Sequence, residues 1–186
     1  LSDKTLLAHG TSDPAKYNEF WLKILECPRF STLKIGHIES HFSVDDCIQY
    51  MSMVFIGNGP MRYIVFRGTD GSLVGWKEDC NLATMKEIPS QKLAKDYVTK
   101  VVKHRFFPFV IIGHSKGGNL AMYATLMMKW RYYGRFKGCY CHDGPGFNDT
   151  KVFSKRALTK LTPKIHKVVP GESLIGLLLH QVTSYR

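Results

Sequence analysis

A serine at residue 115 stands in a pattern that could make it a nucleophile. It lies in the run Gly113-His114-Ser115-Lys116-Gly117, between an apolar, β-branched segment at 109–112 and a helix-forming segment at 120–127. This order predicts a strand, a sharp turn and a helix, with the serine at the apex of the turn. The glycines would leave room for a strained serine backbone, and the helix amino end would attract negative charge. An ordinary turn in which Ser115 only caps the helix is the alternative.

A second polar loop could complete such a site, because it also follows an apolar segment. The run Arg67-Gly68-Thr69-Asp70-Gly71 comes directly after residues 64–66. In a doubly wound sheet, the loops at the carboxyl ends of neighbouring strands converge on one crevice. The backbone N–H or hydroxyl of Thr69 and the backbone N–H of Lys116 are therefore candidate donors to an oxyanion. A surface turn whose polar side chains bond their own backbone is the alternative.

The pattern of apolar residues predicts the elements that would position these loops. We expect helices at 14–27 and 90–103, the second with Ser90 as its amino-terminal cap. A turn at Asn58-Gly59 should join the first two of five strands, which we expect at 49–56, 62–66, 109–112, 138–142 and 164–169. A hairpin followed by strands alternating with helices predicts a three-layer α/β fold with a mainly parallel sheet, in one domain over residues 1–186.

Length and composition restrict the class of protein. A chain of 186 residues has room for one sizeable core, and no apolar run reaches the roughly 18 residues of a membrane span. No signal peptide pattern opens the sequence, although its start at Leu1 leaves open a missing amino-terminal piece. Five cysteines, an odd count, favour reduced thiols and a cytoplasmic location. Cys139, Cys141 and His142 lack a second pair of ligands, so we expect no metal site.

The net charge of +11 and the isoelectric point near 9.5 have a local source. Residues 151–167 contain no acid and carry six cations, Lys151, Lys155, Arg156, Lys160, Lys164 and Lys167. Such a stretch could meet nucleic acid, an anionic membrane or an acidic substrate, or simply be solvated. No nucleic-acid-binding motif is present, so we expect no nucleic acid partner. If the stretch covers the active site, it would dock against an anionic lipid surface.

Both loops, with Trp76 and Asp79, resemble those of α/β-hydrolases of the class 3 lipase type. The resemblance is closer to a bacterial domain family of unknown function within that superfamily, and it extends from about residue 17 onward. It rests on residues 75–79 (GWKED), 143–147 (DGPGF) and 169–176 (VPGESLIG). The resemblance implies the α/β-hydrolase fold and a nucleophilic Ser115. It points to a serine esterase or lipase-like enzyme that acts on a lipid or small acyl ester without a cofactor. A catalytically silent hydrolase fold that only binds a ligand is the alternative.

A nucleophilic serine also needs a histidine to take its proton and a carboxylate to orient that histidine. In α/β-hydrolases these follow in the order serine, acid, histidine. Asp143 comes directly after the predicted strand at 138–142 and is the first candidate for the acid, with Glu172 as its rival. Asp143 could instead be only a turn residue, which its Asp-Gly sequence suits.

His180 is the only histidine that follows both acid candidates. The hydrolase pattern places the base after one more strand, however, and residues 181–185 resemble the start of that strand. Three alternatives therefore stay open. His180 is the base, or a histidine beyond Arg186 is the base, or the chain is a non-catalytic relative.

Overall fold

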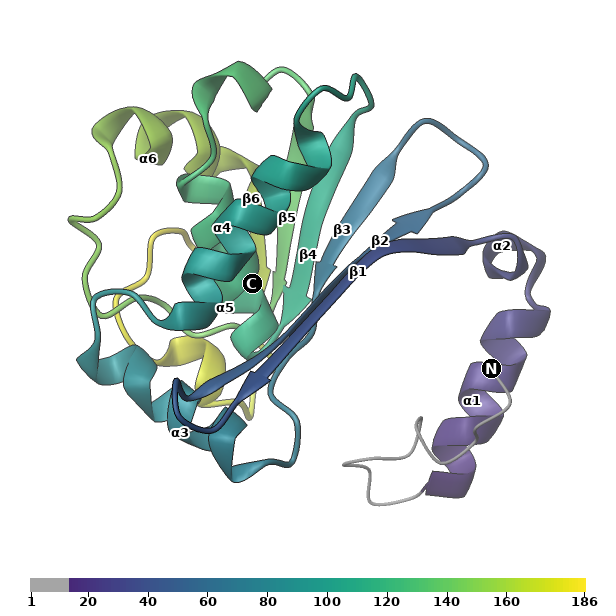
Figure 1. Ribbon diagram of the computed structural model, residues 1–186, viewed down its shortest axis with the longest axis horizontal. Coiled ribbons are helices and arrows are strands. Elements are labelled where there is room, and N and C mark those ends of the chain that lie inside the picture. The colour runs from purple at the N-terminus through teal and green to yellow at the C-terminus, as the bar shows by residue number, and fades with distance from the viewer. Residues whose placement is uncertain (1–13) are drawn as a thin grey trace.

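The computed structural model describes residues 14–186, which fold around one six-stranded sheet (Figure 1). The strands lie side by side in sequence order: β1 (Lys34–Ser43), β2 (Ile48–Ile56), β3 (Arg62–Phe66), β4 (Phe109–His114), β5 (Phe136–His142) and β6 (Ile165–Val168). β1, β2 and β3 pair antiparallel, whereas β3 to β6 are all parallel. The predicted α/β-hydrolase architecture, with a mainly parallel sheet, is confirmed.

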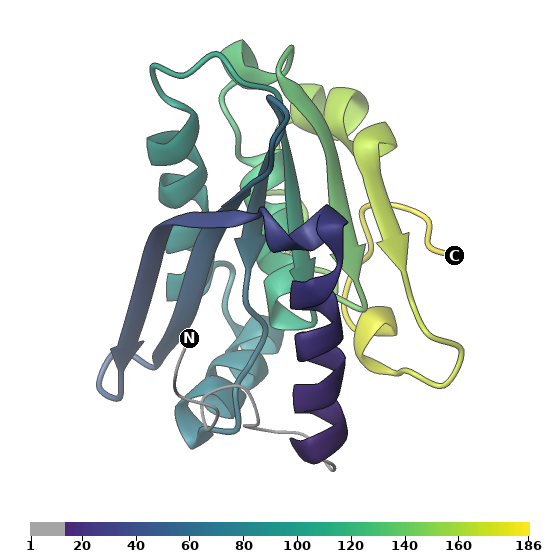
Figure 2. The same ribbon diagram turned by 90° about the vertical axis from the view of Figure 1, so that its right-hand side faces the viewer.

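Helices lie on both sides of this sheet (Figures 1 and 2). They are α1 (Pro14–Glu26), α2 (Pro28–Ser31), α3 (Leu73–Thr84), α4 (Pro89–Val102), α5 (Lys116–Leu126), α6 (Lys155–Leu161) and three short 3-10 turns, η1 (Trp130–Tyr132), η2 (Thr162–Lys164) and η3 (Ile175–Leu177). α4 and α5 pack on one face of the sheet, and α1 lies on the opposite side. The buried faces of α4 and α5 and of strands β2 to β6 form the core.

The local predictions hold where the apolar pattern is strong. All three predicted helices and all five predicted strands are present, with shifts of one or two residues at most ends, although α5 begins at Lys116, four residues before the predicted segment at 120–127. The sequence analysis missed β1, α3 and α6. β1 is exposed along nearly its whole length, so it lacks the alternation that marks a half-buried strand. α6 is short and mostly basic, and α3 buries only three of its residues.

The predicted cap of α4 is wrong, because the helix begins one residue earlier, at Pro89. Ile88 is the N-cap, and its backbone N–H donates to the side chain of Gln91. Ser90 lies in the first turn, and its N–H donates to Glu78 Oε1 at 3.2 Å. Proline suits the first helical position because its missing N–H would have no helical partner there.

The basic stretch at 151–167 does not cover the carboxyl ends of the strands, where Ser115 lies. α6 and η2 lead directly into the start of β6, and Lys164 Nζ donates to the carbonyl of Phe136 at the start of β5. Most of the stretch therefore lies at the opposite, amino end of the parallel strands (Figure 1). Lys167, moreover, is buried.

The last residues of the sequence run beside β6. Tyr185 forms a parallel bridge with Lys167, and Arg186 exchanges backbone hydrogen bonds with Lys167 and Val169. The predicted strand at 181–185 is thus reduced to one bridge. All five cysteines are free thiols, as expected for reduced cysteines. No helix among residues 14–186 is both long and apolar enough to cross a membrane.

Candidate active site

Ser115 occupies a sharp turn between β4 and α5. Its backbone has φ 55° and ψ −127°, a strained combination for a residue with a side chain, and its N–H donates to the carbonyl of His142 at 2.9 Å. A Cβ at Gly113 would lie 2.0 Å from the carbonyl oxygen of Gly117, and a Cβ at Gly117 would lie 2.3 Å from that of Phe66. Both glycines are therefore required by close backbone approach. The serine is raised at the carboxyl edge of the sheet, at the start of a helix.

The loop after β3 lies against this turn. A Cβ at Gly68 would be 3.6 Å from Ser115 Cβ and 2.8 Å from the carbonyl oxygen of His114. The next residue, Thr69, donates its hydroxyl proton to Asp79 Oδ2 at 2.6 Å, which fixes its side chain. Within residues 14–186, no group accepts a hydrogen bond from the backbone N–H of Thr69 or of Lys116. Two unpaired N–H donors thus flank the serine, and the Thr69 hydroxyl is already engaged.

Lys116, directly after the serine, forms a fully buried ion pair. Its ammonium group lies 2.9 Å from Glu78 Oε2, and both side chains have no exposed surface. The other two protons of the ammonium meet the backbone carbonyl and the side-chain oxygen of Gln49, each at 2.7 Å. The three donors of the lysine are therefore all satisfied.

Glu78 is satisfied as completely as its partner. Besides Lys116, its carboxylate accepts the backbone N–H of Gln49 at 3.1 Å and that of Ser90 at 3.2 Å. This network joins β2, α3, α4 and α5 beneath the candidate nucleophile. The sequence analysis gave Glu78 no role, although a lysine in a segment of small and apolar residues was a signal that a buried carboxylate must face it.

Asp143 lies next to the turn, since its neighbour His142 bonds Ser115. Its own φ is 52°. Both carboxylate oxygens are occupied: Oδ2 accepts the hydroxyl of Ser173 at 2.6 Å, and Oδ1 accepts the N–H of Gly176 at 3.0 Å. Asp143 therefore anchors the segment that contains η3, a contact that the sequence analysis did not foresee. Glu172, the rival acid, is exposed and makes no hydrogen bond within the described residues.

His180 is attached to the same loop through its backbone. It exchanges two backbone hydrogen bonds of 3.0 Å with Phe147, and its ring is exposed. Within residues 14–186, no histidine side chain forms a hydrogen bond with Ser115 or with the carboxylate of Asp143. The structure thus brings Ser115, Thr69, Lys116 and Asp143 together, and it holds His180 nearby without a side-chain contact to them.

An amide network fixes the loop after Asp143. Asn119 donates to the carbonyl of Gly146 at 2.6 Å and to that of Pro145 at 3.2 Å, and accepts from Gln91 at 2.8 Å. Because Asn119 lies in the first turn of α5, the nucleophile and the loop that carries Asp143 are held by the same helix.

Exposed apolar side chains flank the site on both sides. α3 contributes Leu73, which is 86% exposed, and Trp76, and the segment around η3 contributes Leu174, Ile175, Leu177 and Leu178. Contacts of neighbouring glycines show that these side chains lie near the site. Gly176, in η3, contacts Asp143, and Gly75, in α3, packs against Thr69. The candidate active site therefore has an apolar rim.

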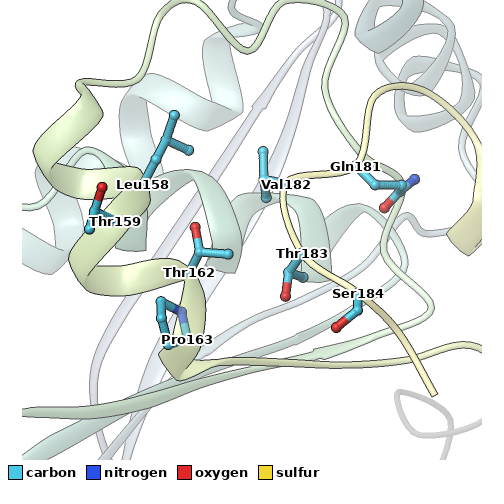
Figure 3. Close-up of a pocket in the computed structure, with 8 residues that line it drawn as sticks. All are labelled: Leu158, Thr159, Thr162, Pro163, Gln181, Val182, Thr183 and Ser184. Atoms are coloured by element: carbon cyan, nitrogen blue, oxygen red, sulfur yellow. The ribbon is translucent and has the colours of Figure 1, made fainter.

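A separate cavity lies away from these residues. It is an open hollow of about 610 Å³ between α6, η2 and residues 181–184 (Figure 3). Its walls are hydroxyls and aliphatic side chains, and none of the candidate site residues lines it. The candidate site at the carboxyl edge of the sheet is therefore separate from this hollow.

The sheet order, the turn at Ser115 and the helix arrangement define an α/β-hydrolase fold. Over residues 24–186 the sequence matches the Mbeg1-like family, and the chain belongs to it. That the family is bacterial stays a prediction. No curated protein matches the sequence.

Among solved structures, an MDLA N225Q mutant from Penicillium cyclopium is similar to this protein with a TM-score of 0.53 at 17% identity. The match covers 99% of this chain and 72% of the Penicillium cyclopium chain. The Rhizomucor miehei lipase propeptide complex has a TM-score of 0.47 at 16% identity, and a triacylglycerol lipase from Penicillium expansum 0.48 at 10%. Each covers 74% of this chain, which spans 48% and 59% of their respective lengths. Of these three structures, the one from Penicillium cyclopium has a TM-score above 0.5, and at 17% identity its likeness shows the fold alone.

We expect Lys116→Met to reduce the free energy of unfolding by about 3–5 kcal/mol, because it leaves the Glu78 carboxylate buried without its partner. The double variant with Glu78→Gln should recover a large part of this loss. Lys100→Met is the matched control, because Lys100 Nζ forms a surface ion pair with Glu39 Oε1 at 2.5 Å. This substitution should reduce the free energy of unfolding by less than about 1 kcal/mol. Urea denaturation of the four proteins measures all three effects. Equal losses at Lys116 and Lys100 would contradict a buried pair.

Asp79 should make stability depend on pH. Burial raises the pKa of its carboxyl above the ordinary value, and the Thr69 hydrogen bond and the Lys116 charge offset this only in part. The folded state therefore binds this proton more readily than the unfolded chain, so the stabilisation present at acid pH is lost as pH rises through the raised pKa. As pH rises from the ordinary pKa of an aspartate to the raised pKa of Asp79, the free energy of unfolding of Asp79→Asn should increase relative to that of the wild type. Above the raised pKa the difference should stay constant. Urea denaturation at several pH values tests this, with the surface change Asp45→Asn as control; a difference that does not vary with pH would contradict it.

Proposed function

We propose that the protein is a serine hydrolase that cleaves a carboxylic ester through an acyl-enzyme formed at Ser115. The observation that carries this proposal is the backbone of Ser115, with φ 55° at the start of α5 and glycines on both sides that admit no Cβ. A helix cap needs none of this strain, whereas a serine that must stand clear of the sheet to reach a substrate does.

The neighbouring donors fit this chemistry. The serine gives its proton to the base as its oxygen attacks the ester carbonyl, and the carbonyl oxygen takes up the negative charge of the tetrahedral intermediate. Collapse of the intermediate breaks the ester C–O bond, and the alcohol leaves with that proton, so that the acyl group stays on Ser115 until water hydrolyses it. The backbone N–H groups of Lys116 and Thr69 are proposed to stabilise that charge, since both are unpaired and lie on either side of the serine. The bond from Thr69 to Asp79 would then fix the loop that presents the second donor.

Asp143 and His180 complete the proposed machinery. Asp143 lies one residue from the carbonyl that binds the Ser115 N–H, and His180 is held beside it through Phe147. The exposed ring of His180 makes no hydrogen bond within residues 14–186, so it is available to turn toward the serine. This chemistry needs neither a metal nor an organic cofactor.

The apolar rim indicates the class of substrate. Side chains such as Leu73 and Leu174, exposed by 86% and 73%, gain by covering an acyl chain. We therefore propose an ester of a lipid or of another apolar acyl group as the substrate.

Ser115→Ala should abolish labelling by a fluorophosphonate reagent and hydrolysis of short p-nitrophenyl esters, because only an activated serine reacts rapidly with either. The change removes one hydroxyl, so the melting temperature should be nearly unchanged. Ser40→Ala, at an exposed position of β1, is the matched control and should label like the wild type. If the folded wild-type protein neither labels nor hydrolyses any of these esters, His180 does not activate Ser115, and a base beyond Arg186 or a non-catalytic, ligand-binding role is left.

Two further variants test the acid and the base. His180→Ala should lower kcat by about 10²–10⁴, the usual effect of losing a general base, and Asp143→Asn should lower it by up to about 10⁴. Glu172→Gln and His166→Ala, both at exposed positions, are the controls and should retain activity. Steady-state kinetics on a soluble ester gives the answer. Full activity in His180→Ala, together with loss in Ser115→Ala, would assign the base to another group.

A further inference from the structure

Two long segments without acidic residues meet at the amino end of the parallel strands. No Asp or Glu lies between Asp96 and Asp143, and none lies in residues 151–167. The N–H of Phe109, at the start of β4, donates to the carbonyl of Arg135, and the Arg156 guanidinium lies 5.4 Å from the centre of the Trp130 ring. We call residues 103–106, 129–135 and 155–164 the amino-edge surface. It lies at the amino ends of β4 to β6 (Figure 1), whereas Ser115 follows the carboxyl end of β4.

A pocket of about 370 Å³ opens on this surface. Its walls are four cations, Lys103, Arg105, Arg131 and Arg135, with His104, Phe106 and Tyr132. Its size is within the range that small ligands occupy in proteins. A pocket walled by cations favours an anionic ligand.

Two of the four cations in the pocket wall, Arg131 and Arg135, are held in place but not neutralised. The Arg135 guanidinium donates to the carbonyls of Val102 and Arg105, and together with Arg131 it lies over the Tyr132 ring, at 5.3 and 5.0 Å. Within residues 14–186, no carboxylate forms an ion pair with any of the four cations. Their charge is therefore available to a ligand.

Two large aromatic side chains protrude beside the pocket. Phe106 is 93% exposed, and Trp130 is 66% exposed. Aromatic rings next to cations are typical of protein surfaces that enter the interface of a bilayer, where the rings reach the acyl boundary and the cations meet anionic headgroups.

We propose that the amino-edge surface docks on a bilayer that carries anionic phospholipids, with a headgroup phosphate in the pocket between Lys103 and Arg131. Phe106 and Trp130 enter the interface on either side of that headgroup. Because Ser115 lies at the opposite end of the strands, this docking leaves the candidate active site accessible from the aqueous side. The surface is thus separate from the site of the proposed hydrolysis.

Vesicle binding of the whole chain tests the proposal without any measurement of activity. The protein should co-sediment with vesicles made of equal parts of phosphatidylcholine and phosphatidylserine, and not with phosphatidylcholine alone. Binding should weaken strongly between about 0.1 M and about 1 M salt, where the Debye length falls from about 10 to about 3 Å. Equal binding to both kinds of vesicle, or none to either, would overturn the proposal.

Variants locate the docking surface. Arg105→Gln with Arg131→Gln should weaken binding about 25-fold, at about fivefold per charge, and Phe106→Ala should weaken it about tenfold. Lys77→Gln with Lys86→Gln removes the same charge from exposed positions at the other end of the molecule, and should change binding little. Melting temperatures confirm that each variant folds. If the two double variants have equal effects, the binding reflects net charge and the proposal fails.

Tryptophan fluorescence tests the orientation. A protein that keeps only Trp130, through Trp21→Phe and Trp76→Phe, should shift its emission to the blue on anionic vesicles and be quenched by brominated lipid. A protein that keeps only Trp76, at the carboxyl edge, should show neither effect. The reverse result would place the candidate active site on the membrane and overturn the proposal. Binding of an anionic oligonucleotide is a separate test. If an oligonucleotide binds the wild type as tightly as the vesicles do, and Phe106→Ala does not change that binding, the proposal is also overturned.

Discussion

The buried pair of Lys116 and Glu78 is the interaction on which the candidate site depends. Removing two charges from water costs several kcal/mol per ion, and the structure offsets this only because every proton of the ammonium and both carboxylate oxygens have partners. Those partners belong to β2, α3, α4 and α5. A shift of any one of these elements would leave a buried charge unpaired. Since Lys116 follows Ser115 directly, the same pair fixes the direction of the N–H that lies beside the nucleophile.

Close backbone approach adds a second constraint that the ion pair alone could not supply. The first turn of α5 lies against the end of β3 at Gly117, and the loop after β3 lies against His114 at Gly68. The nucleophile and the loop that carries Thr69 therefore cannot move independently. Asp79 extends this coupling, because it binds Thr69 from the helix that also provides Glu78. The partly buried carboxylate costs stability at neutral pH, and in return the loop is held in one conformation.

The sequence predicted what is local and missed what is distant. The turn at Ser115 was predictable because a strand, two glycines and a helix are contiguous, and the apolar patterns of β2 to β6 gave those strands within a few residues. The partner of Lys116 lies 38 residues away on a helix whose pattern is weak, so no spacing rule could identify it. Ser173, which binds Asp143 from 30 residues downstream, was hidden for the same reason. The position of the basic stretch was misjudged because α6 was not predicted. The stretch lies at the amino end of the sheet because α6 leads directly into the start of β6.

The polarity of the parallel architecture explains why opposite charges suit its two ends. Helices that follow parallel strands begin at the carboxyl edge of the sheet and end at the amino edge, so their positive ends face Ser115 and their negative ends gather opposite to it. Cations are favourable where helices end, and Arg135 meets this need by binding the last carbonyl of α4, at Val102. Arg135 alone provides the cation that the end of α4 needs. Three more cations, Lys103, Arg105 and Arg131, lie around the same position, and within residues 14–186 no carboxylate forms an ion pair with them. Helix capping thus accounts for one cation there, and the other three have no carboxylate partner within residues 14–186, which is the feature that the proposed membrane docking would explain.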